Sequence, residues 1–291
     1  FQNNGVIVWA SDNFPNDGDV SMMSALPVYF NGTDDSVDLT DAWLTVMYAE
    51  FTGSSLSGAS TEDFNRLGNT CGAAKEWCLV VDDQQIKAAT FINGSDASIY
   101  GTAGGSSMGA PQVSGMIALL AQAFPNHTPE QLTDRILASA NNAWFTANGV
   151  TTFTTHGASI QHGYNNEWGH GVPDMEAALS PITSSSNTGS FGFGSAGGSS
   201  GGSSSGGSIP FSSMKKLAVS ETAMQTSSSL GDAIINGLSG KTAYAYDALN
   251  AGFKFNVTDF VSIDSLNDQQ VEYTIDDELN NLRNFKFDDK K

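Results

Sequence analysis

Two serines stand before a run of small and apolar residues, in a pattern that could present a nucleophile. Gly104 and Gly105 come directly before Ser106 and Ser107, and the residues that follow, as far as Leu120, have helical spacing. Glycines allow a tight turn, and a hydroxyl at the start of a helix lies beside free backbone N–H groups and the positive end of the helix dipole. Such a serine can attack a carbonyl, because the same N–H groups can bind the resulting oxyanion. From composition alone, an N-cap serine before an ordinary buried helix is the simpler interpretation.

The residues after Ser107 predict a helix that packs on several sides. Val113, Ile117 and Leu120 recur at helical spacing, and most residues between them are small. Pro111 is expected in the first turn of this helix, where the missing N–H costs nothing.

A second polar group follows the first apolar run of the chain. Residues 5–10 (GVIVWA) are continuously apolar, which is typical of a parallel strand buried on both faces. Asn13 comes three residues later, where the carboxyl end of such a strand opens on a ligand crevice in α/β folds. Its amide is well placed to contact a ligand there, although an ordinary turn asparagine would give the same pattern.

Two other catalytic arrangements fit the chain less well. Residues 11–13 spell Ser-Asp-Asn and residues 212–215 spell Ser-Ser-Met-Lys, but in β-lactamases the second motif precedes the first. No G-x-S-x-G surrounds Ser107, which counts against a serine esterase of the α/β-hydrolase type.

The charge of the chain limits its partners. Its 291 residues carry a formal net charge of −19, and no Lys or Arg precedes Arg66. Such a surface repels nucleic acid and anionic lipid, and it suits an exported protein. Acidic residues from Asp12 to Asp19 could hold calcium, but they lack the spacing of an EF-hand loop, and no cofactor is expected to be required.

Composition divides the chain into three parts. Residues 1–182 contain expected strands at 43–49 and 79–81, and a helix at 129–138 that a capping box opens at Thr128. Residues 183–212 are mostly Gly and Ser without any charge, which predicts a flexible linker. Residues 213–291 contain an expected helix at 227–238 and alternating apolar residues at 253–257, which indicate a small α+β segment.

Several strings of the first part resemble one enzyme family. Residues 104–111 (GGSSMGAP) resemble the G-T-S-M-A-x-P string around the nucleophile of subtilisin-like serine proteases, the subtilases. Residues 111–120 (PQVSGMIALL), 43–46 (WLTV) and 168–178 (WGHGVPDMEAA) also resemble subtilase segments. Gln112 stands where many members have histidine, and Asp12 stands where they have glycine.

The resemblance implies a fold and a chemistry. The fold would be α/β, a subtilisin-like parallel sheet with helices on both faces. The activity would be hydrolysis of peptide bonds in a protein or peptide substrate, with Ser107 as nucleophile and Asn13 as oxyanion-binding residue.

The resemblance also implies that this is the C-terminal half of a catalytic domain. Subtilases carry their catalytic residues in the order Asp, His, Ser. The four histidines of the chain all follow Ser107 and are therefore expected to be surface or structural residues: His127, His156, His162 and His170. The catalytic aspartate and histidine are expected upstream of Phe1, in a longer precursor.

The third part resembles the segment between protease and β-barrel in autotransporter subtilases. The strings concerned are 230–240 (LGDAIINGLSG) and 246–253 (YDALNAGF). This implies secretion to the bacterial outer-membrane surface, with an outer-membrane β-barrel in the full precursor. In an exported chain Cys71 and Cys78 would form one local disulfide, whereas in the cytosol they would be two thiols. The alternative function is a non-catalytic surface adhesin or stalk on a degenerate subtilase fold.

Overall fold

The computed structural model describes residues 4–14, 18–30, 38–90, 99–155, 158–182, 224–226, 228–256, 258 and 261–263. The chain forms two compact units. The first comprises residues 1–210 together with 246–252, and the second comprises residues 211–245 together with 253–291. The predicted linker at 183–212 lies outside the described residues, so the three-part division of the sequence stays a prediction.

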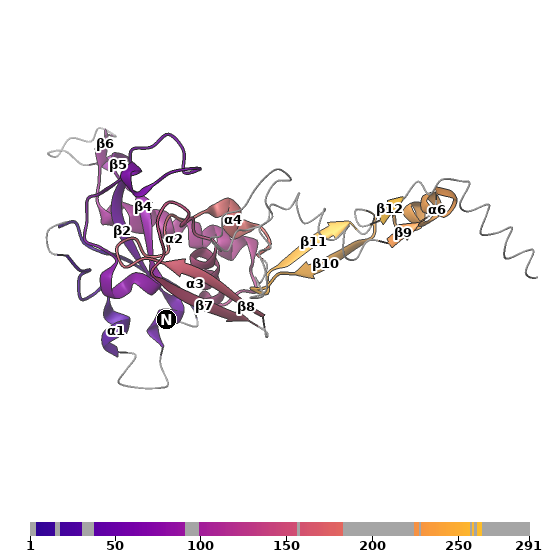
Figure 1. Ribbon diagram of the computed structural model, residues 1–291, viewed down its shortest axis with the longest axis horizontal. Helices are drawn as coiled ribbons and strands as arrows, with labels where there is room; N and C mark the ends of the chain where they lie inside the picture. The colour runs from indigo at the N-terminus through magenta and orange to yellow at the C-terminus, as the bar shows by residue number, and fades with distance from the viewer. Residues whose placement is uncertain are drawn as a thin grey trace, which may run out of the picture. The chain divides into compact units, whose positions relative to one another are not determined.

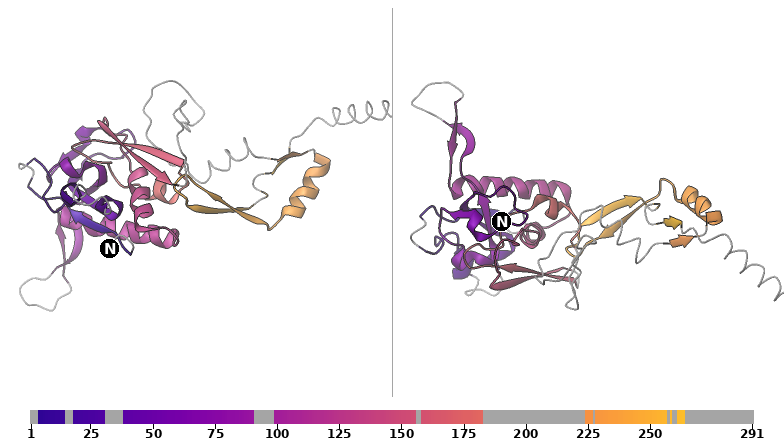
Figure 2. Two further views of the ribbon diagram at one scale, coloured as in Figure 1. Left: turned by 90° about the horizontal axis from the view of Figure 1, so that it is seen from below. Right: turned by 45° about the horizontal axis from the view of Figure 1, so that its top comes forward.

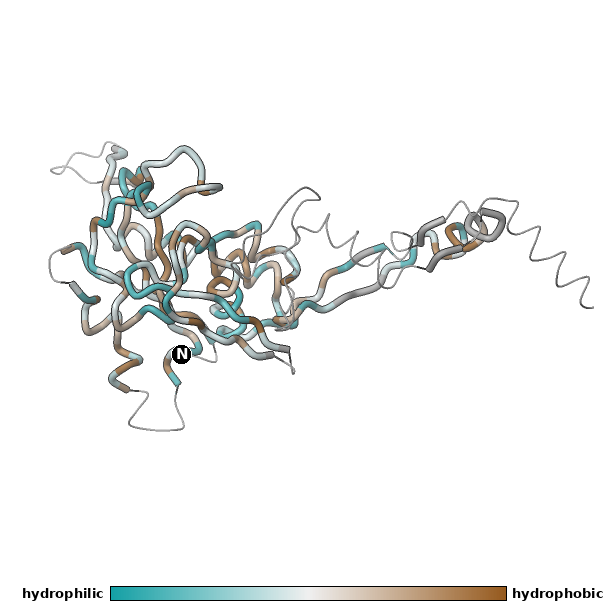
Figure 3. Tube along the Cα trace, viewed as in Figure 1, coloured by the Kyte–Doolittle hydropathy of each residue, from teal (hydrophilic) through white to brown (hydrophobic). Residues whose placement is uncertain are grey.

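A four-stranded sheet forms the centre of the first unit (Figure 1). Strand β2 (Trp43–Phe51) pairs in parallel with β1 (Ile7–Ala10) and with β4 (Cys78–Asp82). The end of β2 also pairs with the short antiparallel strand β3 (Phe64–Arg66). Strands β2 and β4 are mostly apolar and most of their residues are buried, and the brown hydrophobic stretches of Figure 3 include parts of these strands.

Helical segments lie on both faces of this sheet, as expected from the sequence. Helix α2 (Ser106–Ala123) packs across β1, β2 and β4, with Gly109 against Val46. Met47, the next residue of β2, points to the opposite face and joins a buried cluster with both cysteines and with Trp168. The 3₁₀ helix η3 (Gly72–Trp77) covers that second face. The predicted α/β class is therefore confirmed.

Helix α3 (Pro129–Ala138) begins as the sequence predicts. The Thr128 hydroxyl accepts the Gln131 N–H at 3.2 Å, and the Gln131 side chain accepts the Thr128 N–H at 3.0 Å. This reciprocal capping box fixes the start of the helix. The expected apolar face is buried as well, through Leu132, Ile136 and Leu137.

Two sequence expectations are wrong. Helix α2 begins at Ser106, so Pro111 lies inside the helix rather than in its first turn, and its ring removes the N–H that would bond the Ser107 carbonyl. Strand β1 is only half-buried, with Trp9 37% exposed. The reason is that β1 has a single neighbour, β2, among the described strands.

The remaining elements of the first unit are short. Hairpin β5–β6 extends away from the sheet in both views of Figure 2. A second hairpin, β7–β8, carries His162 on β8. These elements span Leu26–Phe30 (α1), Leu39–Ala42 (η1), Thr61–Asp63 (η2), Ile86–Thr90 (β5), Ile99–Ala103 (β6), Gly149–Thr155 (β7), Ala158–Tyr164 (β8) and Met175–Leu179 (α4).

The second unit contains the expected helix α6 (Ser228–Leu238) and short strands. Strand β9 (Met224–Thr226) pairs in parallel with β12 (Val261–Ile263), against which α6 packs. Strands β10 (Thr242–Tyr246) and β11 (Gly252–Asn256) form a hairpin. Helix and strands together match the predicted α+β character. None of the helices in the described ranges is long and apolar enough to cross a membrane.

Candidate active site

Ser107 is the second residue of helix α2, and its side chain is exposed. Among the described residues its hydroxyl has no hydrogen-bond partner. Its backbone N–H belongs to the first turn of the helix, where no carbonyl of the helix can accept it, and no other described group does so. A free hydroxyl and a free N–H therefore lie at the positive end of an 18-residue helix.

Asn13 reaches this helix end from the loop after β1. Its Oδ1 accepts the Ser106 N–H at 2.8 Å and the Ser106 hydroxyl at 2.9 Å. Because a backbone N–H only donates, the atom facing it must be the amide oxygen, and the NH₂ group points elsewhere. The structure thus brings Asn13 next to the candidate nucleophile, across 93 positions of sequence.

Two free donors, the Asn13 NH₂ group and the Ser107 N–H, can bind the same oxyanion. The Nδ2 group of Asn13 makes no hydrogen bond within the described part of the chain, and neither does the Ser107 N–H. An oxyanion formed by attack of the Ser107 hydroxyl would develop beside a backbone N–H and a fixed amide. Ser106, which the sequence offered only as a neighbour, is the residue that fixes the amide.

Gly105 makes this close approach possible. Its φ of 130° is an angle that glycine adopts readily and other residues rarely adopt. A Cβ at this position would lie 3.1 Å from the Asn13 Nδ2. A side chain would both strain the turn and push the amide away from Ser106.

Asp12, which stands where the resembling subtilase segments have glycine, does not disturb the position of Asn13. Its Oδ1 accepts the Asn13 N–H at 2.6 Å, while the Asn13 side chain still reaches Ser106. The substitution therefore leaves the Asn13–Ser106 contact intact.

The described histidines lie in structural positions. His162 and His170 are fully buried, with their Nδ1 atoms 2.8 Å apart, and His162 Nε2 lies 2.9 Å from the Ala140 carbonyl. Burial lowers the pKa of His162 to about 4 and that of His170 well below its usual range. Of the two expected alternatives, a surface or a structural position, this pair therefore has the structural one. His127 is half-buried, and His156 lies outside the described residues.

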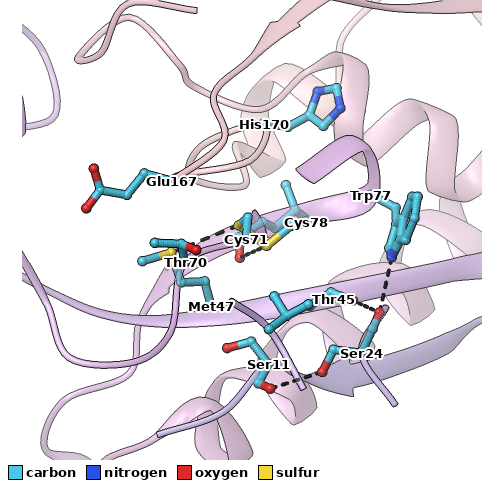
Figure 4. Close-up of a disulfide and its surroundings, with 12 residues drawn as sticks. Ser11, Ser24, Thr45, Met47, Thr70, Cys71, Trp77, Cys78, Glu167 and His170 are labelled. Atoms are coloured by element: carbon cyan, nitrogen blue, oxygen red, sulfur yellow. Dashed lines mark hydrogen bonds between the residues drawn. A yellow bond between two sulfur atoms is a disulfide. The ribbon is translucent and has the colours of Figure 1, made fainter. Parts of the chain in front are cut away.

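The two cysteines form a disulfide, shown in Figure 4. Both are fully buried, and Cys71 N–H bonds the Glu167 carbonyl at 2.9 Å while His170 N–H bonds the Cys78 carbonyl at 2.9 Å. The bridge joins the residues that flank η3, and these backbone hydrogen bonds tie both cysteines to the residues around Trp168, on the sheet face opposite α2. Among the described residues, no cluster of three or more His, Cys, Asp or Glu side chains is arranged to hold a metal.

Asp83 is a buried acid that sequence reasoning missed. It follows β4, and neither oxygen of its fully buried carboxyl has a hydrogen-bond partner. Its Oδ2 lies 2.6 Å from where a Gly109 Cβ would be, so the acid fills space under the first turns of α2. Burial, assisted by the charge of Asp82, raises the pKa of Asp83 to about 7. An acidic pair directly after a buried apolar run was the signal that could have revealed it.

We expect the variant Asp83→Ala to be more stable than the parent at high pH. A carboxyl whose pKa is raised by folding stabilises the fold below its unfolded pKa, and this contribution is lost as the pH rises through about 7. The shift corresponds to a few kcal/mol, on the order of 1.4 per pKa unit, less the cost of a small cavity. Denaturant unfolding at pH 5 and pH 8 measures the effect.

The exposed neighbour provides the control for this experiment. Asp82→Ala removes an exposed carboxyl from the same turn and leaves Asp83 buried, so it should keep most of the parent's pH dependence, because burial is the larger cause of the raised pKa of Asp83. An Asp83→Ala protein that loses stability between pH 5 and pH 8 as steeply as the parent would contradict the assignment.

The chain matches a known protein family. A family model described as the subtilase family (peptidase S8) matches residues 2–171, more than half of the chain. A search of curated proteins gave no match.

Solved structures give low-identity matches that cover only part of each protein. The prenylagaramide maturation protease PagA is 16% identical over 60% of this chain and 49% of its own, with a TM-score of 0.37. MycP1 from Mycobacterium smegmatis is 25% identical over 60% and 41%, with a TM-score of 0.35. Fervidolysin from Fervidobacterium pennivorans, a keratinolytic enzyme related to subtilisin, is 19% identical over 60% and 22%, with a TM-score of 0.38. This chain therefore spans less than half the length of each of these three proteins.

Proposed function

Because the chain belongs to the subtilase family of serine peptidases, we propose that it forms the nucleophile half of an endopeptidase active site, with Ser107 as nucleophile. One observation carries this proposal. The Asn13 amide is held on Ser106 at 2.8 Å, so a side-chain donor stands beside the exposed Ser107 hydroxyl and its free N–H. A serine that only capped a helix would need no such second donor.

The proposed reaction is acyl transfer. The Ser107 hydroxyl loses its proton to a histidine and attacks the carbonyl carbon of the scissile peptide bond. The oxyanion accepts hydrogen bonds from the Ser107 N–H and the Asn13 NH₂ group. Collapse of this intermediate expels the amine, which takes the proton, and water then hydrolyses the acyl-enzyme. The reaction uses side chains and backbone alone, without a cofactor.

The histidine and its aspartate are proposed to come from an upstream part of the same catalytic domain. None of the described histidines hydrogen-bonds Ser107, and two of them are buried in the disulfide region. Helix α2 carries no charged residue, and its apolar side chain Leu119 is 54% exposed. An apolar helix face and the half-buried strand β1 both support a further part of the domain that covers them.

We also propose an exported location, at the bacterial outer-membrane surface. The buried disulfide supports an oxidising compartment, and the acidic surface suits an exported protein. The autotransporter β-barrel remains part of this proposal through the resemblance of residues 230–253. No feature of the described residues favours the adhesin or stalk alternative, since Asp12 leaves the Asn13 contact intact.

Labelling with a serine-directed fluorophosphonate tests the proposed function. The 291-residue chain alone is expected to label weakly and to hydrolyse peptides at background rates, because it lacks the base that activates Ser107. A longer protein that carries the upstream residues should label at Ser107 and hydrolyse peptides. Strong Ser107-dependent turnover by the chain alone would contradict the upstream base, and no labelling of the longer protein would favour the adhesin or stalk.

A further inference from the structure

Arg135 is a fully buried cation on the inner face of helix α3. Its Nε and one terminal nitrogen donate to the carbonyls of Ala178 and Ser180, the latter at 2.7 Å. The other terminal nitrogen donates to Asp247 Oδ2 at 2.8 Å, and both side chains of this ion pair are at most 1% exposed. The guanidinium also stacks on the Phe124 ring at 4.4 Å. A buried cation of this kind needs a carboxylate, because burial without a counter-charge is very costly.

Asp247 supplies this carboxylate from a short turn far along the chain. The turn comprises residues 246–252, which group with the first unit. Asp247 Oδ1 accepts the N–H groups of Leu249 at 3.0 Å and Ala251 at 2.8 Å, and its own N–H bonds the Ala251 carbonyl. The aspartate therefore also holds its own turn together, and a turn held by its own hydrogen bonds loses less entropy on docking.

The turn makes further contacts with the chain that precedes the Gly/Ser-rich stretch. Asp247 Oδ2 accepts the Ile182 N–H at 3.0 Å, and the Ala248 N–H bonds the Ile182 carbonyl at 2.9 Å. Leu249 and Ala251 are buried, each with at most 1% of its surface exposed. Two hydrogen bonds to Ile182, the ion pair with Arg135 and the buried Leu249 thus hold the turn in the first unit. One partner of each hydrogen bond and of the ion pair lies at or before residue 182, and the other lies at or after residue 246.

We propose that residues 246–252 are a docking turn that keeps the C-terminal part of the chain bound to the protease part after the chain between them is cut. The contacts just described all join residues that precede the segment 183–245 to residues that follow it. The Arg135 site is thus an internal binding site for a tight turn that carries an aspartate. This inference concerns retention of the cut chain and does not depend on Ser107 being catalytic.

A cleavable form of the full chain tests the proposal. Residues 197–206 are replaced by the recognition sequence of a site-specific protease, the chain is cut, and the two pieces are separated by size exclusion under native conditions. The pieces of the parent should elute together. If they separate, the proposal is wrong, whatever the variants do.

Two matched variants show whether the buried ion pair provides the retention. Asp247→Ala should reduce the retained C-terminal piece at least about tenfold, since truncating one partner of a buried charge pair weakens an interface strongly. Glu167→Gln removes the carboxylate of another arginine pair in the same unit, Arg66–Glu167, whose side chains are 27% and 45% exposed. This control should retain its C-terminal piece like the parent, and equal release by both variants would contradict the assignment to Asp247.

A competition experiment does not depend on the folding of a variant. A peptide of residues 242–256, added in excess to the cut parent, should displace the C-terminal piece. The same peptide with Asp247→Asn should displace it at least about tenfold less effectively, because it lacks the charge that Arg135 requires. Equal displacement by both peptides would contradict a site that recognises the aspartate.

Discussion

Replacement of Ser107 by alanine, in a protein that also carries the upstream histidine and aspartate, is expected to reduce peptide hydrolysis to background. The nucleophile of subtilisin itself shows a loss of about 10⁶ in kcat on removal, and this known magnitude is taken over for the same role here. The substitution removes one exposed oxygen without a partner among the described residues. We therefore expect the free energy of unfolding to change by no more than about 0.5 kcal/mol.

A serine on the same helix provides the control. Ser114 is exposed, and its hydroxyl only bonds the Ala110 carbonyl one turn earlier. Ser114→Ala should keep full activity and full fluorophosphonate labelling, whereas Ser107→Ala should lose both. Labelling that persists in Ser107→Ala would place the nucleophile elsewhere and would overturn the assignment.

Substitution of Asn13 is expected to lower kcat by about 10²–10³ with little change in KM, the range known for the oxyanion-hole asparagine of subtilisin itself. The reason is that its NH₂ group would donate to the oxyanion, which exists only in the reaction. Asn13→Ala also removes the acceptor of the Ser106 N–H, so it should cost about 1 kcal/mol of stability, as for a lost helix cap.

The variant Asn13→Asp separates the two roles of this side chain. An aspartate keeps an oxygen for the Ser106 N–H at the positive end of α2 but has no N–H to donate. Stability should therefore be retained while kcat falls at least as far as in Asn13→Ala, because a negative charge now faces the oxyanion. If Asn13→Asp keeps parental kcat, Asn13 is only a helix cap.

Local signals were sufficient for much of the fold. The apolar runs at 5–10, 43–49 and 79–81 correspond to β1, β2 and β4, because strand character depends on residues within the run itself. The capping box at Thr128 and the helix at 227–238 were likewise predictable from a few adjacent residues. The exact start of α2 was not, and it placed Pro111 inside the helix.

The sequence by itself identified the candidate nucleophile, because the string that resembles the nucleophile segment of subtilases lies wholly within residues 104–111. Only the tertiary structure decided what surrounds it. Ser106 receives the Asn13 amide from 93 residues away, and Asp83 lies without a partner beneath the same helix. Arg135 meets its carboxylate 112 residues later, in a segment that composition would assign to another part of the chain. Propensity and capping act between near neighbours, whereas the partner of a buried polar group is set by which segments pack together.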